Sequence, residues 1–299
     1  MLGFLILAQM STPFSNQSIN FCLLNSISSV DEFLKQYFNC SASKLKKYFA
    51  KSFLNRSLPA HSILDLPLNF VNDGLINPKY SGPEIKILFE DGKFLVMDKP
   101  TNLFVHPLTY DEGNNCLSFL RQKFPELLEI NKKNYDRGLL YRLDFETSGV
   151  LVYVKDKNDY LFLRKNFQEI AKKKLYLCAV SGECKLNNTY THYFSSSQAK
   201  GKKVLVSELE TEGEEGELSV SPVSYNGDTN ITILQVELKS GLRHQIRAQL
   251  AFLGYPLCGD LLYGGAKARR LYLHAQLYEL NFLNFSYKFE SMPIDFNGL

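Results

Sequence analysis

The chain has 299 residues, enough for one large domain or for a main domain with a small appendage. Hydrophobic residues make up 45% and charged residues 22%, the balance of a soluble globular protein. The formal charge of +3 permits a nucleic-acid partner without requiring one, because a local basic patch matters more than the sum. The 6 cysteines form no C-x-x-C pair and share no spacing with histidine. This argues against a zinc site or a disulfide framework and favours thiols in a reducing compartment.

The amino terminus begins with an apolar run, Leu2 to Ala8, which lacks preceding basic residues and is too short to cross a bilayer. This run indicates a first strand or a poorly ordered leader. Elsewhere no apolar stretch approaches about 18 residues, so the sequence predicts no transmembrane helix. We therefore expect a cytoplasmic protein with no membrane partner.

Residues 1–82 are predicted to form an amino-terminal extension with two short helices. Apolar residues recur at helical spacing from Val30 to Phe38 and from Leu45 to Phe49, and Ser41 or Ser43 could cap the second helix. The opposite side of that helix is lysine-rich: Lys44, Lys46 and Lys47. Such a pair of helices resembles the small α-L RNA-binding module in a degenerate form. The alternative is a helical extension with a solvated lysine face.

Residues 83–299 are predicted to form one domain that follows a linker, Asn72 to Pro83, rich in Asn, Asp, Gly and Pro. Period-two and continuous apolar patterns predict its strands, and a spacing of three and four predicts its helices. The expected elements are a hairpin over 87–97, a buried central strand at 149–154, a helix at 158–171, strands at 175–180 and 231–238, and a helix at 243–253 that ends at Gly254. The acidic stretch 208–217 indicates an exposed hairpin tip. Because strands and helices do not alternate strictly, the pattern favours an α+β domain on a mixed sheet.

Two polar segments interrupt this structural pattern near the first strands. Asp98 to Pro107 contains a lysine and a histidine, each followed by proline. Gly138 to Gly149 contains Arg142, Asp144 and a Thr-Ser-Gly turn immediately before the buried strand. A carboxylate just outside a central strand is held by a rigid scaffold, yet each segment taken alone is also compatible with a structural loop.

A third polar segment, Leu238 to Leu250, begins a helix on which Arg243 and Arg247 lie four residues apart. The start of a helix favours anions, and guanidinium groups bind phosphate or carboxylate in a bidentate manner. The alternative is a surface helix with solvated arginines. His244 and Gln245 between the two arginines favour a functional interpretation.

Together and in this order, the segments resemble the RluA-type family of RNA pseudouridine synthases. The family pattern N-K-P-x-G-L-x-V-H-P is matched by D-K-P-T-N-L-F-V-H-P, and H-R-L-D-x-x-T-S-G by Y-R-L-D-F-E-T-S-G. The later pattern T-G-R-x-H-Q-I-R, followed by G-x-P, G-D and Y-G, is matched by S-G-L-R-H-Q-I-R with the same followers, and the closing L-x-L-H-A by L-Y-L-H-A. Departures from the family patterns are Asn102, Tyr141, Ser240, Gln249 and an extra Leu242 between Gly241 and Arg243.

The resemblance implies the pseudouridine synthase fold, a mixed and largely antiparallel sheet with flanking helices and a central active-site cleft. It implies isomerisation of uridine to pseudouridine in structured RNA, a reaction that needs no cofactor and no metal. Asp144 would be the catalytic carboxylate, acting either as a nucleophile toward the ribose or as the base and charge stabiliser of a glycal route. A nearby cation should lower its pKa, and Arg243 is the expected partner.

The resemblance also implies residues that bind the RNA. Tyr176 matches the family tyrosine that stacks on the target base, and Arg142 the arginine that fills the space left by the flipped base. Arg247, Lys99 and the run Lys172 to Lys174 are expected phosphate contacts, the run being alternatively a solvated helix end. Large-subunit ribosomal RNA is the expected substrate, with transfer RNA as the alternative. We expect a monomer that binds RNA and not DNA.

Two other function classes remain open from the residues alone. The same fold could bind structured RNA without turnover, as an assembly factor. A glycoside-cleaving enzyme could also use Asp144, but that class normally needs two carboxylates that flank the bond, and Glu146 is close only in sequence.

Overall fold

The computed structural model describes residues 17–38, 40–72, 75–107, 110–131, 136–196, 203–210, 213–296 and 299. The apolar run from Leu2 to Ala8 lies outside these residues. The chain divides into two compact units, Met1–Asn77 with Pro107–Gly113, and Pro78–His106 with Asn114–Leu299. The division after Asn77 falls within the expected linker, five residues before the expected boundary at 82, and no sequence pattern predicts that 107–113 joins the first unit.

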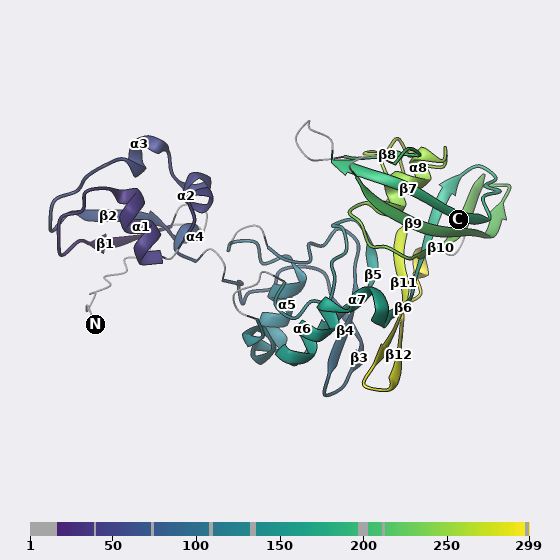
Figure 1. The fold of residues 1–299 in the computed structure, drawn as a ribbon, viewed down its shortest axis with the longest axis horizontal. Helices are drawn as coiled ribbons and strands as arrows, with labels where there is room; N and C mark the ends of the chain where they lie inside the picture. Colours follow the sequence, from purple (N-terminus) through teal and green to yellow (C-terminus); the bar gives the residue numbers. More distant parts are fainter. Residues whose placement is uncertain are drawn as a thin grey trace. The chain divides into compact units, whose positions relative to one another are not determined.

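The first unit is a small layer of helices on a two-stranded antiparallel sheet (Figure 1). Its elements are β1 (Ser18–Cys22), α1 (Val30–Phe38), α2 (Ala42–Tyr48), α3 (Lys51–Leu54), β2 (Ile63–Pro67) and α4 (Leu68–Val71). Val30 and Leu34 turn the apolar face of α1 into a core in which the ring of Phe70 is central. Ser41 caps α2, since its hydroxyl accepts the backbone N–H of Lys44 at 3.2 Å. Both expected helices are therefore present, and Ser41 is the cap.

The second unit is built on one large sheet with helices beside it (Figure 1). Its strands are β3 (Lys86–Glu90), β4 (Phe94–Lys99), β5 (Ser148–Val154), β6 (Ala171–Ser181), β7 (Asn188–Ser196), β8 (Val204–Ser207), β9 (Glu214–Asn226), β10 (Ile231–Leu238), β11 (Leu273–Phe282) and β12 (Phe285–Glu290). Its helices are α5 (Cys116–Lys123), α6 (Lys157–Lys165), α7 (Phe167–Ile170), α8 (Gln245–Phe252) and the 3-10 turns η2 (Pro125–Glu129) and η3 (Ile294–Phe296). The expected α+β class is confirmed.

The strand order is β3-β4-β5-β11-β6-β10-β9-β7-β8, with β12 paired to β11. Among the described strands, every pairing is antiparallel except that of β5 with β11. Every residue of β5 is buried, as its continuous apolar run predicted for a strand inside the sheet. The strand pair β5 and β11 brings the loop that precedes each strand to the same edge of the sheet.

Two predicted elements differ from the structure. The single helix expected over 158–171 is α6 followed by α7, with a break at Asn166, whose side chain bonds back to the carbonyl of Phe162 at 2.8 Å. The acidic stretch 208–217 is not a hairpin tip, because β8 and β9, the strands on either side of it, both pair with β7 and not with each other. Its last residues, from Glu214, already belong to β9. Among the described residues, no helix is both long enough and apolar enough to cross a membrane.

Candidate active site

Asp144 lies in a tight turn that the Lys99 to Leu103 loop holds in place. The Asp144 carbonyl accepts the N–H of Thr147 at 3.2 Å, which closes the turn. The Phe145 carbonyl accepts the N–H of Leu103 at 3.1 Å, and the Glu146 carbonyl accepts the hydroxyl of Thr101 at 2.7 Å. The backbone on both sides of the carboxylate is therefore fixed by neighbouring main chain, while the Asp144 side chain remains 27% exposed.

Gly149 explains why this turn can lie against β11. Its φ is +112°, and a Cβ at this position would be 2.2 Å from the carbonyl oxygen of Ala275. Only glycine allows β5 and β11 to approach so closely in parallel. The glycine of the Thr-Ser-Gly turn is thus a packing requirement that places Asp144 beside the β11 edge.

The cation at Asp144 is Arg247, on the first turn of α8. Its Nη1 lies 3.2 Å from Asp144 Oδ2 and 3.6 Å from Glu146 Oε2. Its other nitrogens form a bidentate pair with buried Asp260, at 2.7 Å from Nε to Oδ2 and 2.9 Å from Nη2 to Oδ1. Burial disfavours the guanidinium charge, yet the bonds and charge of Asp260 outweigh it and raise the pKa of Arg247. Asp260 therefore fixes the arginine that faces Asp144.

These contacts correct two predictions about the arginines. Arg243 was expected to pair with Asp144, but its side chain is exposed and Arg247 takes that place. Arg247 was expected to bind phosphate, but it is only 4% exposed and is occupied by carboxylates. Leu242 is not an insertion either. Counted back from His244, it stands at the first arginine of the family pattern, and Arg243 at the variable position that follows.

His244 gives Asp144 a second polar neighbour. Its backbone is left-handed, with φ of +53°, at the residue before α8. Its Nδ1 lies 3.0 Å from the Tyr263 hydroxyl, which also accepts the N–H of Val204 at 3.0 Å. If the Tyr263 proton goes to Nδ1, neutral His244 carries its proton on Nε2, 3.8 Å from Asp144 Oδ2. Burial lowers the pKa of His244, so the neutral imidazole dominates near pH 7.

Lys99 corrects a third prediction. It was expected to bind phosphate, but its side chain is completely buried. Its ammonium donates to the carbonyls of Leu103 at 2.7 Å, Pro100 at 3.0 Å and Phe145 at 3.1 Å. Since an ammonium has three protons, none is left for an RNA phosphate. Lys99 is a buried tie between its own loop and the residue that follows Asp144.

Tyr176 is one of three buried tyrosines that contact one another next to the carboxylate. The ring of Tyr141 stacks on that of Tyr278, with centroids 4.1 Å apart and an interplanar angle of 8°. The Tyr278 and Tyr176 hydroxyls share a hydrogen bond. Burial raises the pKa of Tyr176 to about 12, and the charge of Asp144 adds to this increase. On the sheet, Tyr176 pairs with Ala275, and Ala275 pairs with Gly149 at the end of the Asp144 turn.

The other basic residues of the predicted site differ in exposure. The Arg142 side chain is 59% exposed, with Nε 3.9 Å from an oxygen of Asp136. Lys172 and Lys173 are exposed on β6. Lys174 is buried and donates to the carbonyls of Lys239 and Ser240, both at 2.9 Å. Only the first two lysines of the run can therefore reach a ligand without rearrangement.

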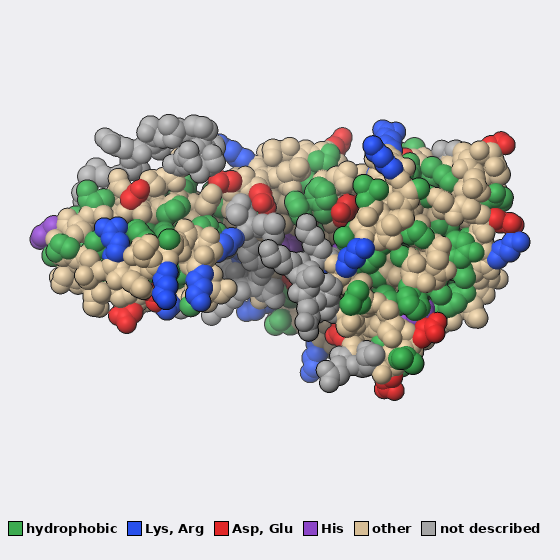
Figure 2. All heavy atoms as spheres, turned by 90° about the horizontal axis from the view of Figure 1, so that it is seen from above, with side chains coloured by type: hydrophobic (Ala, Val, Ile, Leu, Met, Phe, Trp, Pro, Cys, Tyr) green, Lys and Arg blue, Asp and Glu red, His purple; other side chains and the backbone are tan. Residues whose placement is uncertain are grey.

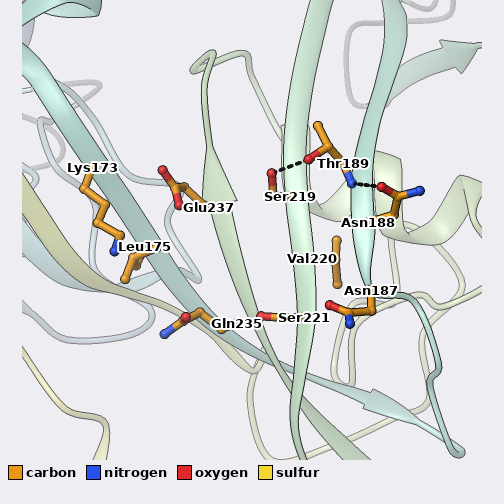
Figure 3. Close-up of a pocket in the computed structure, with 10 residues that line it drawn as sticks. All are labelled: Lys173, Leu175, Asn187, Asn188, Thr189, Ser219, Val220, Ser221, Gln235 and Glu237. Carbon is orange, nitrogen blue, oxygen red and sulfur yellow. Dashed lines mark hydrogen bonds between the residues drawn. The ribbon is translucent and has the colours of Figure 1, made fainter.

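A hollow of about 290 Å³ on the sheet does not have Asp144 among its lining residues (Figure 3). Most of its lining side chains carry amide or hydroxyl groups, and these come from β7 and the residue before it, from β9 and from β10. Lys173 and Leu175 line it, and they alternate along β6 with Lys174 and Tyr176. Successive side chains of a strand point to opposite faces, so this hollow and Tyr176 are on different faces of the sheet.

Charges of the two signs are interspersed on the surface. On the face drawn in Figure 2, the described basic side chains stand among acidic ones and do not merge into one broad patch. RNA binding on this face would therefore depend on local contacts more than on a wide positive field.

Four residues that contact the neighbours of Asp144 were not among the predicted site residues. Glu146 and Asp260 contact Arg247, Tyr263 contacts His244, and Tyr278 contacts Tyr176. Asp260 and Tyr263 do lie in the quoted G-D and Y-G patterns, so a signal for them was present. Gly259 reinforces it, because its φ is +84° and a Cβ there would be 1.8 Å from the Arg270 carbonyl oxygen. For Tyr278, the residues provided no signal beyond a strand aromatic.

Comparison with known proteins gives a consistent result. A family model described as RNA pseudouridylate synthase matches residues 93–252. The chain is 31% identical over 202 residues to an uncharacterized RNA pseudouridine synthase of Helicobacter pylori, covering 66% of this chain and 76% of that protein. It is 27% identical over 201 residues to an uncharacterized RNA pseudouridine synthase of Bacillus subtilis, covering 66% of this chain and 64% of that protein.

A further relative is ribosomal large subunit pseudouridine synthase D of Pseudomonas aeruginosa, 28% identical over 186 residues, or 61% of this chain and 54% of that protein. The chain thus spans between 54% and 64% of the length of the Pseudomonas and Bacillus relatives. Among solved structures, human RNA pseudouridylate synthase domain containing 1 superposes with a TM-score of 0.58 at 20% identity, covering 70% of this chain and 84% of that one. This likeness confirms the expected fold.

Proposed function

The chain belongs to the RNA pseudouridylate synthase family, and we propose that it isomerises uridine to pseudouridine in structured RNA. The reaction breaks the bond from ribose C1′ to uracil N1 and forms a bond from C1′ to C5. The C5 hydrogen is lost and N1 gains a proton, so no redox partner is needed. The observation that supports this function best is Asp144, a partly exposed carboxylate fixed by backbone contacts beside Arg247.

Asp144 is the proposed catalytic residue, as the nucleophile at C1′ or as the base of the glycal route. Arg247 pairs with the carboxylate and orients it, and Asp260 keeps Arg247 in place. Tyr176 is the proposed stacking partner of the flipped uracil. Exposed Arg142 is proposed to enter the space that the base leaves, and exposed Arg243 to contact RNA phosphate.

We propose large-subunit ribosomal RNA as the substrate, because the Pseudomonas relative is named for that RNA. Transfer RNA is the second candidate. The first unit is proposed to assist as an RNA-binding module, with the exposed lysines of α2, Lys46 and Lys47, as its contact surface. Such substrates place the protein in the cytoplasm, where we propose that it acts as a monomer.

The experiment is incubation with unmodified ribosomal and transfer RNA transcripts labelled with tritium at uridine C5. Isomerisation releases the label to water, whereas a glycoside-cleaving enzyme would release labelled uracil. Asp144→Asn should abolish release while RNA binding, measured by filter retention, stays within about twofold, because only the reacting carboxylate changes. The matched control is Asp159→Asn. Asp159 is an aspartate of α6 that pairs with Lys93.

Three outcomes would overturn the proposal. Undiminished release by Asp144→Asn would remove Asp144 from the chemistry. Free labelled uracil would assign glycoside cleavage, with Glu146 as the second carboxylate, since both contact the same Arg247 nitrogen. Tight binding of every transcript without conversion would assign a non-catalytic assembly factor.

A further inference from the structure

The buried tyrosines next to Asp144 come from three separate parts of the second unit. Tyr141 precedes β5, Tyr176 is on β6, and Tyr278 is on β11. They are 8%, 6% and 3% exposed, so each hydroxyl needs a partner inside the protein or at the site. Tyr141 also stands where the family pattern has histidine, so this arrangement is a property of this chain.

The hydrogen bonds of the three hydroxyls can be assigned by elimination. Tyr141 donates to the Val150 carbonyl at 3.0 Å. Within the described residues, the hydroxyls of Tyr176 and Tyr278 have each other as partners. If Tyr176 donated, the proton of Tyr278 would be left unpaired in the interior, which is costly. If Tyr278 donates, the unused proton is that of Tyr176, which lies across β11 from the start of β5, the strand that follows the Asp144 turn.

The second arrangement also agrees with the electrostatics. Burial raises the pKa of Tyr278 well above its usual value, and the charges of Tyr176 and Tyr141 and the bond to Tyr176 add to this. The same bond lowers the pKa of Tyr176 relative to burial alone. A hydrogen bond stabilises the deprotonated form of its acceptor, so these directions agree with the donor assigned above from burial and position.

We propose that Tyr278 is a positioning residue, which donates its hydroxyl proton to Tyr176 and so fixes the plane of the Tyr176 ring, the surface on which the target uracil stacks. This inference rests on the proposed function. Tyr141 supports this role of Tyr278. The two rings stack in parallel, and this contact fixes the Tyr278 ring in the position in which its hydroxyl meets that of Tyr176. The donated bond restrains the Tyr176 side chain, so that its ring already has the stacking orientation before the uracil arrives.

The test is a double-mutant cycle with Tyr176→Phe, Tyr278→Phe and the combined variant, in the tritium-release assay. Tyr278→Phe keeps the ring and its stacking on Tyr141 and removes only the hydroxyl. It should lower kcat about tenfold, the value of one hydrogen bond, and leave KM within about twofold. Because Tyr278 acts through the Tyr176 hydroxyl, Tyr278→Phe should cause no further loss in the Tyr176→Phe background.

The control is Tyr153→Phe on β5, which removes another buried hydroxyl of the second unit, bonded to the carbonyl of Leu127 in η2. It should reduce thermal stability as much as Tyr278→Phe does and leave kcat unchanged. The role of Tyr278 is overturned if the losses of kcat in the two single variants multiply in the combined variant, or if Tyr176→Phe is fully active. Tritium release by the wild type would still support the synthase activity in either case. Absence of release by the wild type would overturn both proposals together.

Discussion

Lys99 should make the stability of the protein rise with pH in the alkaline range. Its ammonium is completely buried, and burial lowers its pKa from 10.5 to about 8, although the nearby charges of Asp144 and Glu146 oppose the shift. The folded protein therefore releases this proton at lower pH than the unfolded chain does. Between pH 8 and 10.5 the unfolded state binds more protons, so the free energy of unfolding increases with pH.

The magnitude follows from the difference between the two pKa values. A shift of about 2.5 pH units at 1.36 kcal/mol per unit gives roughly 3 kcal/mol. Below pH 8 the folded state bears the whole cost of the buried charge, and above 10.5 it bears none. Lys99→Met, which fills a similar volume without a charge, removes this dependence.

The assay is urea unfolding of the wild type and Lys99→Met, followed by far-ultraviolet circular dichroism at several values from about pH 7 to about pH 10.5. The other titrating groups are the same in both proteins. The difference between their free energies of unfolding therefore reports the contribution of Lys99 alone. The wild type should gain about 2 to 3 kcal/mol relative to the variant over this range. If the difference in the free energy of unfolding between the two proteins stays constant within about 0.5 kcal/mol over this range, the inference that burial lowers the pKa of Lys99 is wrong.

Four further predictions concern the second unit and α2. Arg247→Met should lower pseudouridine formation at least about 100-fold and stability by about 3 to 5 kcal/mol, because it leaves a buried carboxylate unpaired, and steady-state kinetics and thermal unfolding measure both. Arg243→Ala, at an exposed position, should weaken RNA binding by less than about tenfold with kcat unchanged, and an effect equal to that of Arg247→Met would contradict the assignment. Gly149→Ala should lower the melting temperature by several degrees, about 2 kcal/mol or more, since its Cβ collides with backbone. Lys46→Glu with Lys47→Glu should raise KM for long transcripts and leave kcat unchanged, and an unaltered KM would exclude α2 as an RNA contact.

Local patterns were enough to predict the elements that depend on local sequence. The alternation in Ile231 to Leu238 gave β10 with its correct ends, and the Glu90-Asp91-Gly92 turn gave the first hairpin. In contrast, β7 and β9 are rich in Ser, Thr, Asn and Glu, and pairing with each other stabilises them more than their own propensity does. Their positions follow from the sheet as a whole and not from a window of sequence.

The candidate site shows the same limit. The motifs located Asp144, but they could not decide which of two nearby arginines faces it, Arg243 before α8 or Arg247 on its first turn. The left-handed backbone at His244 decides this, because it turns the chain so that Arg247 enters the interior and Arg243 stays outside. Lys99 was misinterpreted for a similar reason. A lysine beside an active-site motif suggests phosphate binding, and only the three carbonyls around its ammonium reveal a structural role.

The parallel pairing of β5 with β11 has a consequence for how the protein is made. β11 lies between β5 and β6 in the sheet, although it follows them by about a hundred residues in the chain. During synthesis both strands leave the ribosome with an unpaired edge, and those edges stay open until residues 273–282 emerge. The central part of the sheet, and with it the contact between Tyr278 and Tyr176, is therefore completed only after residues 273–282 have been synthesised, and nascent chains that lack them cannot assemble it.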